Sequence, residues 1–284
     1  MIPDQLTETH CSFVNTWECD ENAHLNVQFY LKRFDEAARF FNLLHGSGTH
    51  DGPLPSARHV RYHAELPSGR TTRILSGQIA DGAFGGWVVH VMEDTVTARI
   101  SATAIDGPSG VKFKNQVPES AVTTALPRSV ETPRPPRTGS EVLGVGGVVS
   151  HQCIAQPGEC DVQGRLLQQF YVAHMSNAAA RVWDHAGIDI KWLEENNFGR
   201  VAVEMKLVHH EAARAGDAVM LYSVPEAMGR KTLRLHHELV RASDGAALMT
   251  SEVVALIMDL GTRKVVQIPD SIAERLNSLA IAGD

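Results

Sequence analysis

The feature that most constrains the fold of this chain is a long internal repeat. Residues 18–38 (ECDENAHLNVQFYLKRFDEAA) align with residues 159–179 (ECDVQGRLLQQFYVAHMSNAA) at an offset of 141, with nine identities in 21 positions. Roughly one or two identities would be expected by chance. A second pair, GVKFKNQVPES at 110–120 and GTRKVVQIPDS at 261–271, follows in the same order at an offset of 151. A long period with only two copies predicts two domains in tandem and not a solenoid.

The segment between the copies is rich in proline and polar residues. It includes SVETPRPPRTGSE at 129–141, and proline favours an extended, semi-rigid backbone. The sequence therefore predicts a first domain over residues 1–125, a linker over 126–144 and a second domain over 145–284.

Each copy shows the same order of predicted elements. A short strand comes first, SFVNTWEC (12–19) in copy one and VVSHQCIA (148–155) in copy two. A helix follows, because apolar residues recur at spacings of three and four from Val27 to Leu44 and from Leu167 to Ala186. Alternating segments separated by turn residues then predict an antiparallel meander. A long helix against an antiparallel sheet is an α+β layer, and the chain is predicted to contain two.

Charge and hydropathy exclude several function classes. The chain has 284 residues, a formal net charge of −7 and no run rich in Lys or Arg, so no nucleic-acid partner is expected. No stretch approaches the ~20 consecutive apolar residues of a membrane-spanning helix, and the N-terminus does not resemble a secretory signal. The sequence predicts a cytoplasmic protein without membrane association.

The cysteines predict neither disulfides nor a metal centre. No two of them form a C-x-x-C pair, and cytoplasmic thiols stay reduced. A zinc site built from cysteines and the pairs His209–His210 and His236–His237 lacks the usual ligand spacing. Because neighbours on a strand alternate between its faces, one ring of each pair is expected to point inward and the other to solvent. No metal and no cofactor are predicted.

The segment that opens the first helix resembles the signature of hotdog-fold acyl-CoA thioesterases of the 4-hydroxybenzoyl-CoA thioesterase-like group. That signature, Cys-Asp-x-x-Gly-His-x-Asn followed by Phe-Tyr-Leu, stands here as CDENAHLN (19–26) and FYL (29–31). The resemblance covers nearly the whole chain. It implies two tandem hotdog domains, each an antiparallel sheet wrapped around a long central helix, which form a pseudo-dimer. It also implies an acyl-CoA or acyl-carrier-protein substrate, thioester hydrolysis and a homodimer of the whole chain.

The resemblance further implies which residues act. The family's catalytic carboxylate precedes the helix, as general base or nucleophile, and this points to Asp20 and Asp161. His24 and Asn26 would orient water or the carbonyl, and the first N–H groups of the helix would stabilise the oxyanion. An Asp or Asn before a helix is also the commonest N-cap, and a histidine can simply be packed, so structural roles stay open.

The two copies depart from the signature in different ways. Copy one has Ala23 where the family has Gly, while copy two keeps Gly164 but has Arg165 and Leu167 in place of His and Asn. The prediction is that the Asp20 site does most of the chemistry. Arg165 is expected to bind an anionic part of the substrate, such as a CoA phosphate, because guanidinium groups bind phosphate bidentately.

Two tyrosines on the helices are further substrate-binding candidates, Tyr30 and Tyr171, although core packing is the simpler role for both. Two other functions also remain open. Hotdog hydratases carry D-x-N-P-x-H, which Asp20 and His24 match poorly because they lie four residues apart without the proline. A non-catalytic acyl-CoA-binding module is the second alternative, although no DNA-binding extension accompanies the two copies.

Overall fold

The computed structural model describes residues 2–45, 54–130 and 134–279, and it divides the chain into two units. Unit 1 comprises residues 1–128 together with 167–172, and unit 2 comprises residues 129–166 and 173–284. The predicted linker spans this boundary, and its residues 131–133 lie outside the described residues. Each unit contains one antiparallel sheet and one long helix, which is the α+β arrangement predicted from the repeat.

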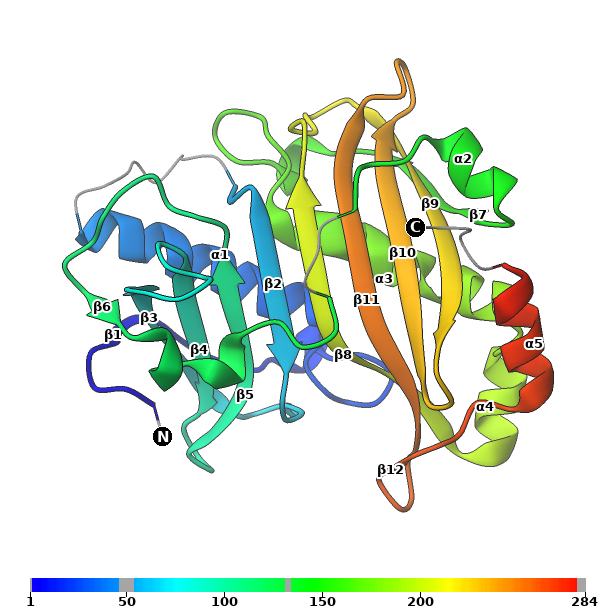
Figure 1. Ribbon diagram of the computed structural model, residues 1–284, viewed down its shortest axis with the longest axis horizontal. Coiled ribbons are helices and arrows are strands. Elements are labelled where there is room, and N and C mark those ends of the chain that lie inside the picture. The colour runs from blue at the N-terminus through cyan, green and yellow to red at the C-terminus, as the bar shows by residue number, and fades with distance from the viewer. Residues whose placement is uncertain (1, 46–53, 131–133, 280–284) are drawn as a thin grey trace. The chain divides into compact units, whose positions relative to one another are not determined.

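Unit 1 is a five-stranded antiparallel sheet with a helix on one face (Figure 1). Its strand order is β1-β3-β4-β5-β2, and α1 (Val27–Leu44) contacts β1, β3 and β4. The strands are β1 (Thr7–Phe13), β2 (Ala57–Tyr62), β3 (Thr71–Ile79), β4 (Val88–Asp94) and β5 (Arg99–Asp106), and the short β6 (Gln116–Val117) pairs in parallel with β3.

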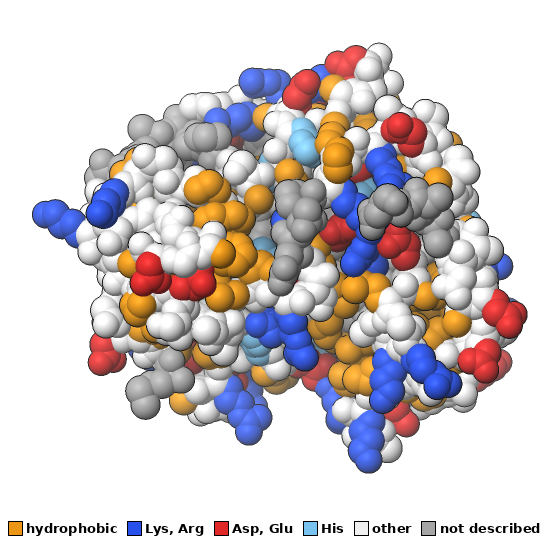
Figure 2. Space-filling view, viewed as in Figure 1, with side chains coloured by type: hydrophobic (Ala, Val, Ile, Leu, Met, Phe, Trp, Pro, Cys, Tyr) orange, Lys and Arg blue, Asp and Glu red, His pale blue; other side chains and the backbone are white. Residues whose placement is uncertain are grey.

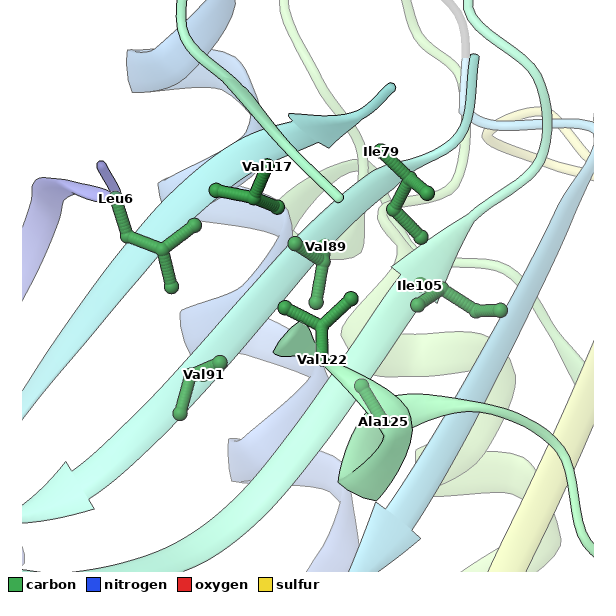
Figure 3. Packing of buried hydrophobic residues seen from close by; sticks show 8 residues of the cluster. All are labelled: Leu6, Ile79, Val89, Val91, Ile105, Val117, Val122 and Ala125. Carbon is green, nitrogen blue, oxygen red and sulfur yellow. The ribbon is translucent and has the colours of Figure 1, made fainter. Parts of the chain in front are cut away.

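An apolar cluster covers the other face of this sheet (Figure 3). Strand residues alternate between faces, so Val89 and Val91 point away from α1 while His90 points toward Phe34 of that helix. Short 3₁₀ turns at Glu119–Ala121 and Thr123–Ala125 close the cluster. Its members are Leu6, Ile79, Val89, Val91, Ile105, Val117, Val122 and Ala125.

Unit 2 repeats this plan with longer strands. Its strand order is β8-β11-β10-β9-β7, and its long helix is α3 (Gln168–His185), of which residues 168–172 are grouped with unit 1. The strands are β7 (Val148–Ile154), β8 (Phe198–His209), β9 (Ala218–Met228), β10 (Thr232–Arg241) and β11 (Ala247–Asp259), with β12 (Lys264–Val265) paired to β11. Three short helices are additional: α2 (Gly139–Gly144), α4 (Ile190–Asn196) and α5 (Asp270–Ser278).

The pairing registers match between the units. In unit 1, Ser76 lies opposite His90, and in unit 2, Ser223 lies opposite His237. A break in register between Glu8 and His10 of β1 recurs between Val149 and His151 of β7. The repeat read from the sequence is therefore a repeat of strand pairing as well. The second repeated segment is not matched in this way, because β6 corresponds at the offset of 151 to residues 267–268, which belong to no strand.

Two expectations about strands were wrong. The first strand runs from Thr7 to Phe13 and not over 12–19, since Thr16–Glu18 forms a 3₁₀ turn. His236 and His237 are both buried, because α2 packs against the β9 face that lies opposite α3.

Among the described residues, no helix is long and apolar enough to cross a membrane. On the face drawn in Figure 2, acidic and basic side chains are interspersed.

Candidate active site

The segment before α1 folds into a small hairpin with Asp20 near its tip. The backbone N–H of Asn26 donates to the Glu18 carbonyl (2.9 Å), and the N–H of Asp20 donates to the His24 carbonyl (2.8 Å). The N–H of Ala23 donates back to the Asp20 carbonyl (3.0 Å), which closes the turn. The sequence predicted a carboxylate at the helix mouth, and the structure places it on this hairpin.

The Asp20 carboxylate is held by backbone donors. Its Oδ1 accepts the N–H of Asn22 at 2.9 Å and the N–H of His24 at 3.2 Å. In the described part of the chain, no Lys or Arg side chain forms an ion pair with it. Burial raises the pKa of the Asp20 carboxyl above its usual value, against the opposing effect of the two N–H donors. A raised carboxyl pKa makes Asp20 a stronger base than an exposed aspartate.

Two further residues of the motif lie on this hairpin and at the helix start. His24 Nε2 lies 3.5 Å from Glu65 Oε2, so a carboxylate orients the ring. Asn26 is the N-cap of α1, and its side chain accepts the N–H of Gln28 at 3.1 Å. The cap is therefore Asn26 and not Asp20. Asn26 also accepts the Phe29 N–H through its backbone carbonyl at 2.9 Å.

The second copy forms the same hairpin from different residues. The N–H of Asp161 donates to the Arg165 carbonyl (2.8 Å), and the N–H of Gly164 donates to the Asp161 carbonyl (2.9 Å). Asp161 Oδ1 accepts the N–H groups of Gln163 at 2.9 Å and Arg165 at 3.0 Å. The backbone environment of the two aspartates is thus the same, and the difference between them lies in the side chains.

Arg165 turns its guanidinium onto Asp161. Its Nε and Nη2 lie 2.9 and 2.8 Å from Asp161 Oδ2, and only 9% of the Asp161 side chain remains exposed. Burial alone would raise the pKa of Asp161, but the hydrogen bonds from Arg165 and its charge hold that pKa below the usual value. The sequence did not reveal this pair, although the spacing of four residues was present in it.

The predicted substrate-binding tyrosines are both buried. Tyr30 is 4% exposed and packs edge-on against Tyr62 with ring centroids 5.2 Å apart. Tyr171 is 2% exposed. Burial raises the pKa of Tyr30 beyond its usual value, so the ring stays a neutral phenol. Their role in substrate binding stays a prediction.

The sequence of the second copy matches a known family model. Residues 155–276 match the model described as the thioesterase-like superfamily, which supports the predicted class of thioester hydrolase. A search of curated proteins found no match.

Solved structures resemble the chain over most of its length. An acyl-ACP thioesterase from Bacteroides thetaiotaomicron has a TM-score of 0.60 at 10% identity, covering 89% of this chain and 98% of that one. A Lactobacillus plantarum protein assigned as an oleoyl thioesterase has a TM-score of 0.60 at 9% identity, with coverage of 90% and 98%. The 12:0-ACP thioesterase from Umbellularia californica has a TM-score of 0.57 at 10% identity, with coverage of 88% and 94%. Together with the superfamily match, these structures confirm the resemblance read from the sequence: the chain has the double hotdog fold of thioesterases, and its second copy matches the thioesterase-like superfamily.

Proposed function

We propose that this chain hydrolyses an acyl-CoA or acyl-carrier-protein thioester, with Asp20 as its catalytic carboxylate. The observation that carries the proposal is the contrast between the two hairpins. Asp20 is half-buried, is hydrogen-bonded by the backbone and has a raised pKa. Asp161 has the same backbone donors, but its second oxygen is engaged by Arg165. A general base needs an accessible lone pair, and this favours Asp20.

Asp20 can serve the reaction in two ways. As a general base, it takes a proton from water while the hydroxide attacks the carbonyl carbon, and the C–S bond breaks as the thiolate leaves and is protonated. As a nucleophile, its carboxylate attacks the carbonyl carbon and expels the thiolate, which is protonated. Water then hydrolyses the resulting mixed anhydride to the free acid and regenerates the aspartate. In both cases Oδ1 is fixed by two N–H groups, which leaves Oδ2 to react.

Neighbouring groups complete the proposed site. The Val27 N–H at the start of α1 would donate to the oxyanion, since the end of a helix carries partial positive charge. His24, oriented by Glu65, would position the water or the carbonyl. Asn26 supports the site by capping the helix that presents these donors. Arg165, Tyr30 and Tyr171 stay candidates for contacts with the substrate, and contact of Arg165 with a phosphate requires its pair with Asp161 to open.

The carrier of the acyl group is also part of the proposal. Two of the similar structures are named as acyl-ACP thioesterases, and this favours testing acyl-carrier-protein substrates beside acyl-CoA. A homodimer and a cytoplasmic location complete the proposed picture. Light scattering at micromolar concentration tests the homodimer, and a mass near the 31.0 kDa of one chain would reject it.

The deciding experiment measures thiol release from a panel of acyl-CoA and acyl-carrier-protein thioesters. Asp20→Asn keeps the shape and can accept the same N–H bonds, so it should lower kcat roughly 10²-fold or more without unfolding the protein. Asp161→Asn is the matched control and should cost far less. Circular dichroism of both variants checks the fold.

Other outcomes point elsewhere. Loss of activity in Asp161→Asn alone would place the chemistry in the second copy. Full activity in both variants would reject the carboxylate mechanism. Hydration of crotonyl-CoA without thiol release would indicate a hydratase, and binding without turnover would indicate an acyl-CoA-binding module.

A further inference from the structure

Unit 2 contains a cluster of metal-ligating side chains that the proposed reaction does not use. His151 and Cys153 lie two residues apart on β7, so both side chains point to the same face of the strand. His174 of α3 faces them: the imidazoles of His151 and His174 stack with centroids 5.4 Å apart. One donor atom from each of the three residues lies within 4.8 Å of the other two.

The distances fit a tetrahedral ion after a small contraction. Cys153 Sγ lies 3.5 Å from His174 Nδ1. With typical zinc bonds to sulfur and nitrogen, the S···N edge of a tetrahedron is about 3.6 Å. The His174–Cys153 pair therefore already has the spacing of two zinc ligands, and a separation at the 4.8 Å limit of the cluster would need to shorten by about 1.2–1.4 Å.

The first copy has a different set of side chains at the equivalent place. Arg33, Ser12 and Glu18 stand at the positions equivalent to His174, Cys153 and Glu159, all at the offset of 141. The Arg33 guanidinium donates to Ser12 Oγ at 3.0 Å and to Glu18 Oε2 at 2.8 Å. Copy one thus holds a buried cation between a hydroxyl and a carboxylate.

Copy two has ligand side chains in place of that cation. At the positions equivalent to Arg33 and Ser12 it has an imidazole and a thiol, while the carboxylate is present as Glu159. The negative charge of Glu159 acts on His151, Cys153 and His174 alike. A divalent ion bound by these side chains would restore the missing positive charge.

The burial of the cluster also suits metal binding. Burial lowers the pKa of His151 and of His174, and neutral imidazole is the ligating form. Nε2 of His151 is buried and has no hydrogen-bond partner among the described residues.

We propose that His151, Cys153 and His174 bind one zinc ion, with Glu159 or a water as the fourth ligand. Sulfur and imidazole donors in a tetrahedral arrangement favour Zn²⁺ over Mg²⁺ or Ca²⁺, which prefer oxygen ligands. Its role would be structural, because the ion would join β7 to α3 as Arg33 joins β1 to α1 in copy one. Sequence inspection missed the site because its ligands form no familiar spacing.

The test loads chelator-treated protein with Zn²⁺ and, separately, with Co²⁺. One equivalent of Zn²⁺ should bind by calorimetry and raise Tm by roughly 5 °C at saturation. Co²⁺ should give the visible bands of a tetrahedral ion and a thiolate charge-transfer band. Cys153→Ser should abolish that band, whereas Cys160→Ser, which changes another thiol of unit 2, should leave it intact.

A double variant controls for the case in which the single substitution Cys153→Ser prevents folding. C153S/H174R introduces the serine and arginine that unit 1 has at the equivalent positions, Ser12 and Arg33. This variant should therefore fold without metal and bind no Zn²⁺. Absence of stoichiometric binding by the wild type would overturn the proposal and leave a Cys153–His174 hydrogen bond alone. An octahedral Co²⁺ spectrum, or one that survives C153S, would identify adventitious metal. None of these readouts depends on thioester hydrolysis.

Discussion

Arg165 covers the carboxylate of Asp161 with two guanidinium nitrogens, at 2.9 and 2.8 Å from the same oxygen. The equivalent position of copy one is His24, whose ring lies against Glu65 instead. The backbone donors of the two aspartates match, but burial raises the pKa of Asp20, whereas the hydrogen bonds and charge of Arg165 lower the pKa of Asp161.

The Arg165–Asp161 pair is expected to stabilise the second hairpin. Arg165→Gln should lower the free energy of unfolding by about 1 kcal/mol, because the pair is largely buried but lies at an edge of unit 2. Urea denaturation measures this, with Arg214→Gln, an exposed arginine near the same hairpin, as control. A change within experimental error would show that the pair contributes nothing. A higher KM with unchanged kcat would show that Arg165 also reaches the substrate.

Ala23 has a positive φ of 59°, a conformation that costs a residue with a side chain about 1 kcal/mol. Gly164 has the same role in copy two with φ of 73°. Ala23→Gly should therefore raise the free energy of unfolding by roughly 0.5 kcal/mol, once the added freedom of the unfolded chain is subtracted. Gly164→Ala should lower it by about 1 kcal/mol. If the two substitutions shift the unfolding midpoint in the same direction, the backbone argument is wrong.

The raised pKa of Asp20 predicts an acid limb in the rate. The base must be deprotonated, so kcat/KM should fall as the pH drops through a midpoint above 3.8, the usual value for aspartate. A pH–rate profile on the best thioester measures this midpoint, and Asp20→Asn should remove the limb from the residual activity. A limb at or below the usual value would contradict the assignment.

The same shift has a consequence for stability. A carboxyl whose pKa is higher in the folded state than in the unfolded state binds its proton more tightly when folded. Its contribution is present below the unfolded value of 3.8 and is lost as the pH rises through the folded pKa. Asparagine cannot ionise, so Asp20→Asn avoids the destabilisation that burying the charged carboxylate causes. The variant should therefore be at least as stable as wild type at pH 7. Thermal unfolding at several pH values checks the sign, and a variant clearly less stable at neutral pH would contradict it.

A buried ion pair of unit 1 is replaced by apolar residues in unit 2. Arg58 donates to Asp106 at 2.5 and 2.6 Å, whereas Met205 and Val253 face each other at the equivalent register. Arg58→Met alone should cost about 3–5 kcal/mol, because it leaves a buried carboxylate without its cation. The double variant R58M/D106V should recover most of that lost stability. The recovery should be incomplete, because His90 loses its hydrogen bond to Asp106 and Gln168 loses its hydrogen bond to Arg58. Additive losses in a double-mutant cycle would reject this coupling.

The sequence predicted the elements whose periodicity is strong. Both long helices lie close to the expected positions, and four antiparallel strands follow each of them as the predicted meander requires, because alternation and three-to-four spacing record which face is buried. The first strand was misplaced, because the apolar residues before Asp20 extend into the 3₁₀ turn at Thr16–Glu18. The repeat would have corrected this prediction. Shifting β7 (residues 148–154) back by the offset of 141 gives residues 7–13, which is β1 as observed.

Side-chain partners within the site were harder to foresee. The motif indicated Asp20 and the helix start, but not that Asn26 would be the cap or that Arg165 would face Asp161. The His151, Cys153 and His174 cluster depends on α3 lying over β7, and a tertiary contact leaves no local pattern in the sequence.

The register break that β1 shares with β7 also orders events in the history of this chain. A feature present in both copies was inherited from the single ancestral domain, as were the Ser76–His90 and Ser223–His237 pairs. A difference between the copies arose after the duplication, and the differences between His24 and Arg165 and between Arg33 and His174 are of this kind. Replacing a residue by its counterpart in the other half would therefore remove one of the changes that separated two initially identical domains.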